Sequence, residues 1–305
     1  MSYVSILNTQ LGFKIKRSKR NRILFSTTAG LALLASVSAS AQQWNGGNGD
    51  WNVAGNWTPA AVPDNPASVV NFVAGAGTVD LGGGTFDVGT MNVGGTYGID
   101  NGTLGLTTGI TVTNVVPTTV TQAGATVLLR GDAQIATQNA DATFLGAITN
   151  SAASTLTLDA SGGTTLQIDG IISDGANPTA VVVGSGGAGV VQLNGVNTFT
   201  GGTDVTAGGT LQNGGTVGAV GVQAGGTLTN SGTAGAVTNA GTVGNTGTIA
   251  SVTQSGGTTT VSGTGTVTGL SDINGGTFDH TSTGASGAVQ NDTGTVTVSA
   301  VRSRR

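Results

Sequence analysis

The sequence lacks cysteine and glutamate and is poor in charged, aromatic and proline residues. All 14 acidic residues are Asp, only 8% of the 305 residues are charged and 4% are aromatic, and there are 5 Pro. The absence of Cys excludes a disulfide framework. Low charge argues against ordinary disorder, and scarce Pro argues against collagen. Gly and Thr dominate instead, with 55 and 51 residues. Because both are poor helix formers, the composition disfavours a helix-rich fold.

The few basic residues are confined almost entirely to the two ends of the chain. Six lie between positions 14 and 22, three lie at positions 302–305, and Arg130 is the only one between them. A chain beginning at Gln42 would carry 14 acids against four bases, a net charge of −10. Since binding to phosphates needs clustered Lys and Arg, we expect no nucleic-acid partner.

The basic cluster precedes an apolar run at 23–37 and the small residues Ala39-Ser40-Ala41. A basic region, a short apolar stretch and an A-x-A motif are typical of a secretory signal peptide. The alternative, a transmembrane helix, needs about 20 apolar residues, and this run is shorter. The sequence therefore predicts a signal peptide at 1–41, with an extended basic region, cleaved between Ala41 and Gln42. Export to the periplasm follows from this prediction.

Short repeated phrases fill the rest of the chain. Gly-Gly-Thr occurs nine times, Asn-x-Gly-Thr recurs near positions 230–248, and runs such as 154–159 alternate apolar residues with Thr. Such alternation predicts short strands with one buried face, and Gly and Asn suit the corners between them. We predict an all-β, right-handed parallel β-helix of about ten coils with roughly 18–22 residues each. A β-sandwich and a Gly-rich low-complexity tail are the alternatives.

Residues 193–212, LNGVNTFTGGTDVTAGGTLQ, resemble the autotransporter-associated β-strand repeat. One extra residue precedes the last Leu of the pattern. The resemblance implies a passenger domain of a bacterial autotransporter. The positions that match the repeat are Leu193, Gly195, Asn197, Phe199, Gly201, Gly202, Thr203, Val205 and Leu211.

All three Trp residues, Trp44, Trp51 and Trp57, lie within 14 positions and are followed by Val62-Pro63 and an apolar strand. This series is similar to the opening module of secreted, repeat-rich bacterial surface proteins. A solenoid end exposes core and backbone, so we expect the three Trp to form a cap. The alternative is carbohydrate stacking on their rings. The predicted organisation is a signal peptide at 1–41, a cap at 42–74, a β-helical passenger at 75–299 and a basic tail at 300–305.

The resemblance is incomplete in one respect. Complete autotransporters end in a membrane β-barrel, which needs many alternating segments and aromatic girdles. The sequence after Phe199 contains one aromatic residue, Phe278, and ends in Val-Arg-Ser-Arg-Arg. We therefore expect contact with a membrane only through a separate or missing translocator.

Groups that could perform catalysis are scarce. From Gln42 onward there is one His, His280, and no Cys, Glu or Lys, and Arg130 has only Asp132 nearby in sequence. Asp279-His280 is interpreted as a solvated pair, and Gly46–Asp50 matches a calcium-binding repeat only in part. We expect no catalytic, cofactor-binding or metal-binding residues.

The predicted function is a non-catalytic, secreted or cell-surface β-helical passenger of a Gram-negative bacterium, serving as a stalk or adhesin at the outer membrane. Its partners would be surface or host glycans, proteins or like cells. One alternative is a β-helical enzyme acting on polysaccharides, a lyase or hydrolase that would use grouped Asp residues. A remote alternative is an ice-binding solenoid, in which the T-x-T runs at 264–268 and 293–297 align into flat Thr ladders.

Overall fold

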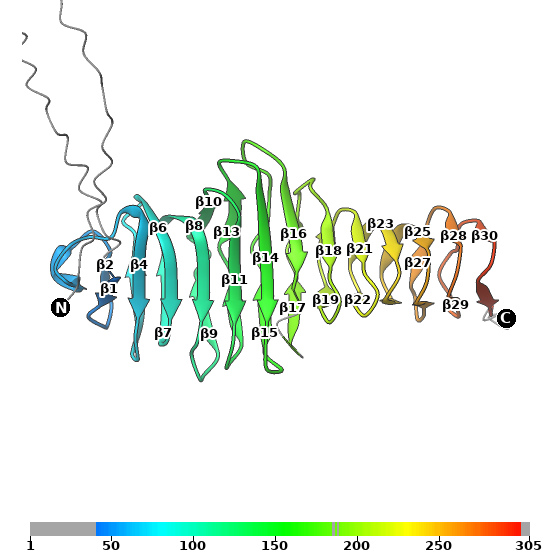
Figure 1. The fold of residues 1–305 in the computed structure, drawn as a ribbon, viewed down its shortest axis with the longest axis horizontal. Coiled ribbons are helices and arrows are strands. Elements are labelled where there is room, and N and C mark those ends of the chain that lie inside the picture. Colours follow the sequence, from blue (N-terminus) through cyan, green and yellow to red (C-terminus); the bar gives the residue numbers. More distant parts are fainter. Residues whose placement is uncertain (1–40, 185–186, 188, 300–305) are drawn as a thin grey trace, which may run out of the picture. The chain divides into compact units, whose positions relative to one another are not determined.

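The computed structural model describes residues 41–184, 187 and 189–299. These residues form 31 β-strands and one short 3-10 helix, η1 (Ala54–Asn56). Successive strands stack into a parallel β-solenoid, which confirms the predicted all-β, β-helical class (Figure 1). The predicted signal peptide up to residue 40, with Ala39 of its cleavage motif, and the basic tail at 300–305 lie outside the described residues.

One sheet runs the length of the solenoid and takes one strand from each coil. All of its 13 strands pair in parallel and in sequence order, and we refer to it as sheet B. Its strands are β2 (Gly49–Asp50), β5 (Ala76–Asp80), β7 (Thr96–Asp100), β9 (Thr118–Thr121), β12 (Ala142–Phe144), β15 (Thr165–Ile168), β17 (Val190–Leu193), β19 (Thr210–Asn213), β22 (Thr227–Asn230), β24 (Thr242–Asn245), β26 (Thr258–Val261), β29 (Thr277–His280) and β31 (Thr295–Val298).

The second sheet, sheet A, has 18 strands and is parallel except where β1 pairs with β3. Long strands in it pair with two shorter ones: β8 pairs with both β10 and β11, so most coils place two strand segments in this sheet. Its strands are β1 (Ala41–Trp44), β3 (Trp57–Thr58), β4 (Asn65–Phe72), β6 (Thr85–Val93), β8 (Gly102–Val112), β10 (Ala125–Leu129), β11 (Ala133–Thr137), β13 (Ala147–Asn150), β14 (Ser154–Ala160), β16 (Thr179–Val183), β18 (Thr203–Val205), β20 (Thr216–Val217), β21 (Val220–Val222), β23 (Thr233–Asn239), β25 (Thr248–Gln254), β27 (Thr266–Val267), β28 (Ser271–Ile273) and β30 (Val289–Asn291).

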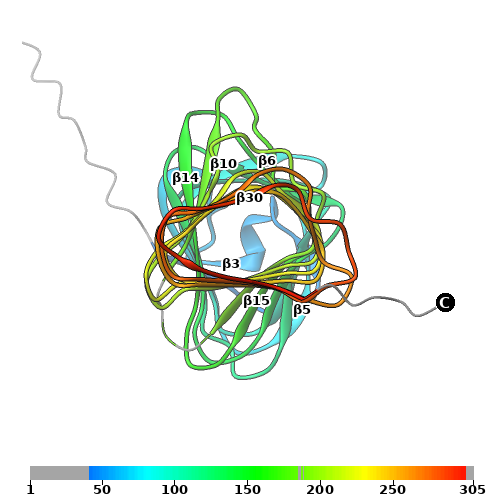
Figure 2. The same cartoon turned by 90° about the vertical axis from the view of Figure 1, so that its right-hand side faces the viewer.

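The coils differ in length more than the sequence predicts. In sheet B, 25 residues separate Leu166 from its partner Val191, whereas 15 separate Leu228 from Val243. Individual coils therefore fall outside the expected range of 18–22 residues, and the 13 strands of sheet B make the coils slightly more numerous than the expected ten or so. The cross-section is wide around β14 and narrow from β18 onward, as the view along the axis also shows (Figure 2). The insertions that widen the middle coils lie in loops between strands.

A thin apolar core runs along the axis between the two sheets. Residues alternate between buried and outward positions along each strand, as in β14, where Leu156 and Leu158 are fully buried and the intervening Thr157 is not. Because parallel neighbours are in register, each buried Leu, Val or Ile contacts its counterparts in the coils on either side. The alternation of apolar and polar residues along each strand therefore produces a continuous column of apolar side chains along the rod.

A column of buried amides replaces the apolar side chains at one corner. Asn213, Asn230 and Asn245 occupy the same register on β19, β22 and β24, and each is at most 1% exposed. Nδ2 of Asn213 donates to Oδ1 of Asn230 at 2.7 Å, and Nδ2 of Asn230 donates to Oδ1 of Asn245 at 2.8 Å. Nδ2 of Asn230 also donates to the Thr248 carbonyl at 3.0 Å. The column links three coils through side chains at a place where the backbone turns.

The N-terminal end of the core is closed by the three Trp rings. Trp44, Trp51 and Trp57 are each at most 1% exposed, and Trp57 packs edge-on against both others at centroid distances of 4.9 and 4.8 Å. Each indole N–H donates to a backbone carbonyl, that of Trp51 to Pro63 at 3.0 Å. This aromatic cluster supports the predicted cap. Buried rings offer no face for sugar stacking, so the carbohydrate alternative at these residues loses its basis.

Two glycines with similar backbone conformation provide a matched test of how tightly the coils approach. Gly257 has φ +64° and Gly263 has φ +60°, a region that disfavours L-residues. A Cβ at Gly257 would collide with the Gly241 carbonyl of the preceding coil, whereas a Cβ at Gly263 meets nothing within 4 Å. We expect Gly263→Ala to cost about 1 kcal/mol of unfolding free energy and Gly257→Ala about 2 kcal/mol more. Urea denaturation measures both; equal losses would show that the coils relax freely.

Candidate functional site

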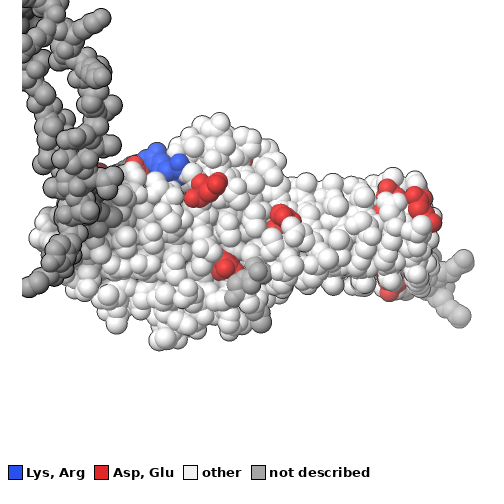
Figure 3. All heavy atoms as spheres, viewed as in Figure 1, with Lys and Arg blue, Asp and Glu red and all other residues white. Residues whose placement is uncertain are grey.

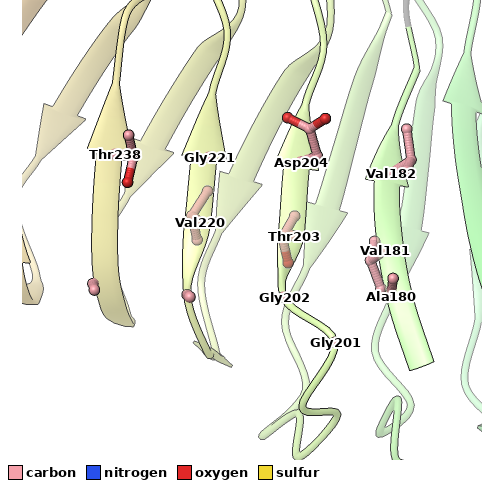
Figure 4. A pocket seen from close by; sticks show the side chains of 12 residues that line it. Ala180, Val181, Val182, Gly201, Gly202, Thr203, Asp204, Val220, Gly221 and Thr238 are labelled. Atoms are coloured by element: carbon pink, nitrogen blue, oxygen red, sulfur yellow. The ribbon is translucent and has the colours of Figure 1, made fainter. Parts of the chain in front are cut away.

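One hollow in the described surface lies on the outer face of sheet A, across β16, β18, β21 and β23. Its volume is about 310 Å³. Figure 4 shows Asp204 on its wall between Val182 and Gly221, with Thr238 on the next strand. Val182, Asp204, Gly221 and Thr238 share one register row, so the missing side chain of Gly221 creates the depth. The hollow is a shallow surface feature formed by side-chain size.

Asp204 is the only titratable group that lines this hollow. Its Oδ2 accepts a hydrogen bond from Nε2 of Gln223 at 2.7 Å. General acid–base catalysis uses two groups with different pKa values, or one beside a nucleophile. Among its lining residues the hollow supplies one carboxylate and no second titratable group. What it can offer chemically is hydrogen bonding to a small polar group beside apolar Ala and Val side chains.

Several Asp carboxylates instead form hydrogen bonds between neighbouring coils. Each accepts the backbone N–H of a residue about 23 to 26 positions later, which is one coil further along the rod. These bonds run to Asp64 from Asp87, to Asp132 from Thr155, to Asp141 from Thr165 and to Asp174 from Thr200, at 2.7–3.2 Å. A carboxylate in this position satisfies a backbone N–H of the next coil, so its role is structural.

Among these four residues, Asp174 accepts the most hydrogen bonds. Its carboxylate accepts the Thr200 hydroxyl at 2.6 Å and the Thr179 backbone N–H at 2.7 Å. The Thr200 hydroxyl has the largest effect and lowers the pKa of Asp174. Burial raises this pKa and the backbone N–H groups of Thr179 and Thr200 lower it, so that it lies below its ordinary value. A lowered folded-state pKa means that the ionised form stabilises the fold. This stabilisation is present above the unfolded pKa and is lost as the pH falls through the folded one.

We expect Asp174→Asn to reduce the acid sensitivity of the solenoid. Between about pH 6 and about pH 2.5 the urea midpoint of the variant should fall less than that of the parent protein, because the variant has no carboxylate at position 174 to be protonated. The exposed Asp292, whose carboxylate accepts from Gln290 at 3.3 Å, provides the control as Asp292→Asn. Parallel pH profiles for the parent and Asp174→Asn would contradict the assignment.

Arg130, the one basic residue within the described solenoid, is paired across two coils. Its Nε and Nη2 donate to Oδ1 and Oδ2 of Asp87 at 2.8 and 3.1 Å. The pair passes over Gly105, where a Cβ would collide with the Asp87 carboxylate. Sequence proximity pointed to Asp132, but the side chain reaches the acid 43 residues earlier. Each group is about 30% exposed, so the pair contributes modestly to stability, on the order of 1 kcal/mol or less.

His280 is buried, and its interpretation as half of a solvated pair is wrong. It lies on β29 with 4% of its surface exposed and stacks on Phe278 at a centroid distance of 6.4 Å. Its register partners are Val261 and Val298, so it continues the column that contains the buried Asn residues. Its Nε2 has no hydrogen-bond partner among the described residues. No nucleophile–base arrangement is formed around the imidazole there.

The carboxylates of the described residues do not assemble into a metal site. Asp50, Asp80 and Asp100 share one register row on β2, β5 and β7, yet no group of three His, Cys, Asp or Glu in the described ranges is placed to hold an ion. Oδ1 of Asp80 already accepts from the Gly82 N–H at 2.6 Å and from Asn101 at 2.9 Å. The Asp80 carboxylate in this row therefore stabilises the adjacent turns through hydrogen bonds.

The residues of the autotransporter-like repeat build one coil. Leu193, Val205 and Leu211 are fully buried in β17, β18 and β19. Phe199 and Thr203 are 4% exposed. Asn197 fills a corner, where its Oδ1 accepts the Ile172 N–H and its Nδ2 donates to the Thr216 carbonyl one coil later.

Glycines make the remaining fixed positions of this repeat possible. A Cβ at Gly195 or Gly201 would collide with a carbonyl of the preceding coil, and Gly202 has φ +80°. Every fixed position thus has a packing role.

The predicted cleavage site falls at the edge of the described chain. Ala41 begins β1, which pairs in parallel with β4, and Gln42 is 4% exposed. Nε2 of Gln42 donates to the Ala61 carbonyl at 3.0 Å. Gln42 is therefore part of the first rung of sheet A.

The fold defines the class of the chain as a parallel β-solenoid. Comparison with protein-family models, with curated proteins and with solved structures found no match. The fold is compatible with an autotransporter passenger, and that resemblance rests on the residues quoted above. Among the described residues, no helix has the length and hydropathy needed to cross a membrane.

Proposed function

We propose that the chain is a non-catalytic, secreted or cell-surface β-solenoid passenger of a Gram-negative bacterium, acting as a stalk or adhesin. The observation that carries the proposal is the use of its polar groups. Four Asp carboxylates hold neighbouring coils through backbone N–H groups, and Arg130 is paired with Asp87. These six side chains hold the scaffold together, so they are not free to serve a catalytic site.

The surface chemistry of the narrow half supports a contact role. No charged residue occurs between Asp204 and Asp272, and the side of the rod shown in Figure 3 is free of Asp and Arg over that stretch. Outward positions carry hydroxyl, amide and methyl groups. Such a surface suits uncharged partners, including glycans and neighbouring cell-surface proteins, and it is unsuited to nucleic acid. The proposed signal peptide and separate translocator would bring it to the cell exterior.

Attachment assays test this proposal directly. Cells lacking the gene, and cells complemented with it, are compared for adhesion to glass, to immobilised glycans and to one another. The proposal expects adhesion to at least one of these to fall in the deletion strain and to return on complementation. Unchanged adhesion on every surface would contradict it. Release of reducing ends from polysaccharides by the purified protein would favour the enzyme alternative instead.

Complementation with a variant that lacks one coil distinguishes a stalk from an adhesin. Residues 228–242 span one repeat of the sheet B register, because Leu228 pairs with Val243. Their removal shortens the rod by one coil while keeping the stacking. A stalk tolerates this change, whereas an adhesin whose contact surface includes these coils loses attachment.

A further inference from the structure

One outward row of sheet B consists of threonine alone in six successive coils. Strands β19, β22, β24, β26, β29 and β31 pair in parallel and place these residues in one register, with no shift between them. The four nearest the C-terminal coil are exposed and the first two are half-buried. The row comprises Thr210, Thr227, Thr242, Thr258, Thr277 and Thr295; we call it the Thr face together with the outward row beside it.

The second row of the Thr face lies two residues further along each strand. It contains Gln212, Thr229, Gly244, Thr260, Asp279 and Thr297. Strand geometry sets the repeat at about 4.8 Å along the rod and about 6.6 Å across it. Because every pair in this part of sheet B is unshifted, the hydroxyl and methyl groups of the first row form a regular array.

The charge and size of the Thr face restrict what can bind it. Asp279 is its only charged residue, so a charged partner gains little there. Five steps of about 4.8 Å by four residues of about 3.3 Å cover roughly 300 Å², well under the about 800 Å² per partner of a stable protein interface. A second copy of this chain is therefore a poor occupant. Its outward rows contain no aromatic residue, since Phe278 points into the core, so sugar rings find no stacking platform.

We propose that the Thr face of sheet B binds the surface of ice crystals. Ice is uncharged and periodic, and it presents donors and acceptors at a spacing close to that of the strand repeat. A row of Thr hydroxyls can take part in its hydrogen-bond network while the methyl groups fill the spaces between water molecules. This function goes beyond the proposed role as a stalk or adhesin and does not depend on it.

The array differs from the one that the T-x-T runs predict. Residues 264–268 include β27 of sheet A, whereas residues 293–297 include β31 of sheet B. The two runs lie on different faces and cannot form one ladder. The ladder is built instead from the Thr of Gly-Gly-Thr and related phrases, one from each coil.

Thermal hysteresis and ice-crystal shaping of the purified chain from Gln42 onward test the proposal. The parent protein is expected to show a freezing-point gap and faceted crystals. The double substitution Thr242→Lys and Thr258→Lys, at exposed positions of the face, should abolish most of both effects. The control places Lys at Thr233 and Thr253, which are exposed on β23 and β25 of sheet A; it should retain both effects. Circular dichroism checks that both variants are folded.

Each other outcome overturns the proposal. A parent protein without hysteresis or crystal shaping does so at once. Equal losses in the two double variants would show that ice contact does not involve the Thr face. Sedimentation with crystalline cellulose or chitin that is lost only in the Thr242 and Thr258 variant, without any effect on ice, would assign the face to a glycan.

Discussion

Replacement of Trp51 by alanine is expected to lower the free energy of unfolding by about 3 to 5 kcal/mol. Its ring is fully buried and contacts Trp57, Phe72 and Phe86 at centroid distances of 4.8, 6.2 and 5.7 Å. Truncation leaves a cavity among these rings, and it removes the indole N–H that donates to the Pro63 carbonyl. Urea denaturation followed by circular dichroism measures the loss.

Val53→Ala is the matched control, because Val53 lies two residues away in the same segment and is 45% exposed. Its effect should stay within about 0.5 kcal/mol. A Trp51→Ala variant as stable as this control would show that the aromatic cluster does not close the core.

Asn230→Asp is expected to destabilise the solenoid by at least about 3 kcal/mol at neutral pH. The substitution keeps the shape of the side chain but removes its N–H donors to Asn245 and Thr248 and adds a charge at a site with no exposed surface. Burial away from any cation raises the pKa of the introduced carboxyl group in the folded state. The destabilisation should therefore shrink in acid and grow as the pH rises through that folded pKa.

Urea midpoints measured across the pH range check both the size and the sign. Asn274→Asp provides the comparison, because Asn274 is exposed at the end of β28. It should be nearly neutral and independent of pH. A pH-independent loss in Asn230→Asp would mean that packing, and not the amide column, is what the corner requires.

The solenoid itself could be predicted because its cause is local. Gly-Gly-Thr and Asn-x-Gly-Thr mark the corners, and alternation such as that of Ser154–Asp159 marks the half-buried strands. The phrases alone do not tell the sheets apart, because Thr210 and Thr216 both end a Gly-Gly-Thr phrase but belong to sheet B and sheet A, respectively. The burial of the three Trp follows from the same physics, since a rod must close its core.

What could not be predicted depends on how coils of unequal length add up. Coils of 15 to 25 residues decide which side chains meet, so Arg130 finds Asp87 and His280 enters the core column. A local sequence pattern does not reveal the summed length of the preceding coils, which sets these contacts. The six-residue Thr row could be assigned only once each phrase had its place in the register.

Confinement of every tryptophan to one end has a spectroscopic consequence. Tryptophan emission reports only the first rungs, whereas the far-ultraviolet signal averages over both sheets. A stacked array whose coils contact only their neighbours can lose its narrow coils while the aromatic end persists. Two midpoints that coincide would then demonstrate cooperativity along the whole rod, and their separation would measure how far a disturbance in one coil travels.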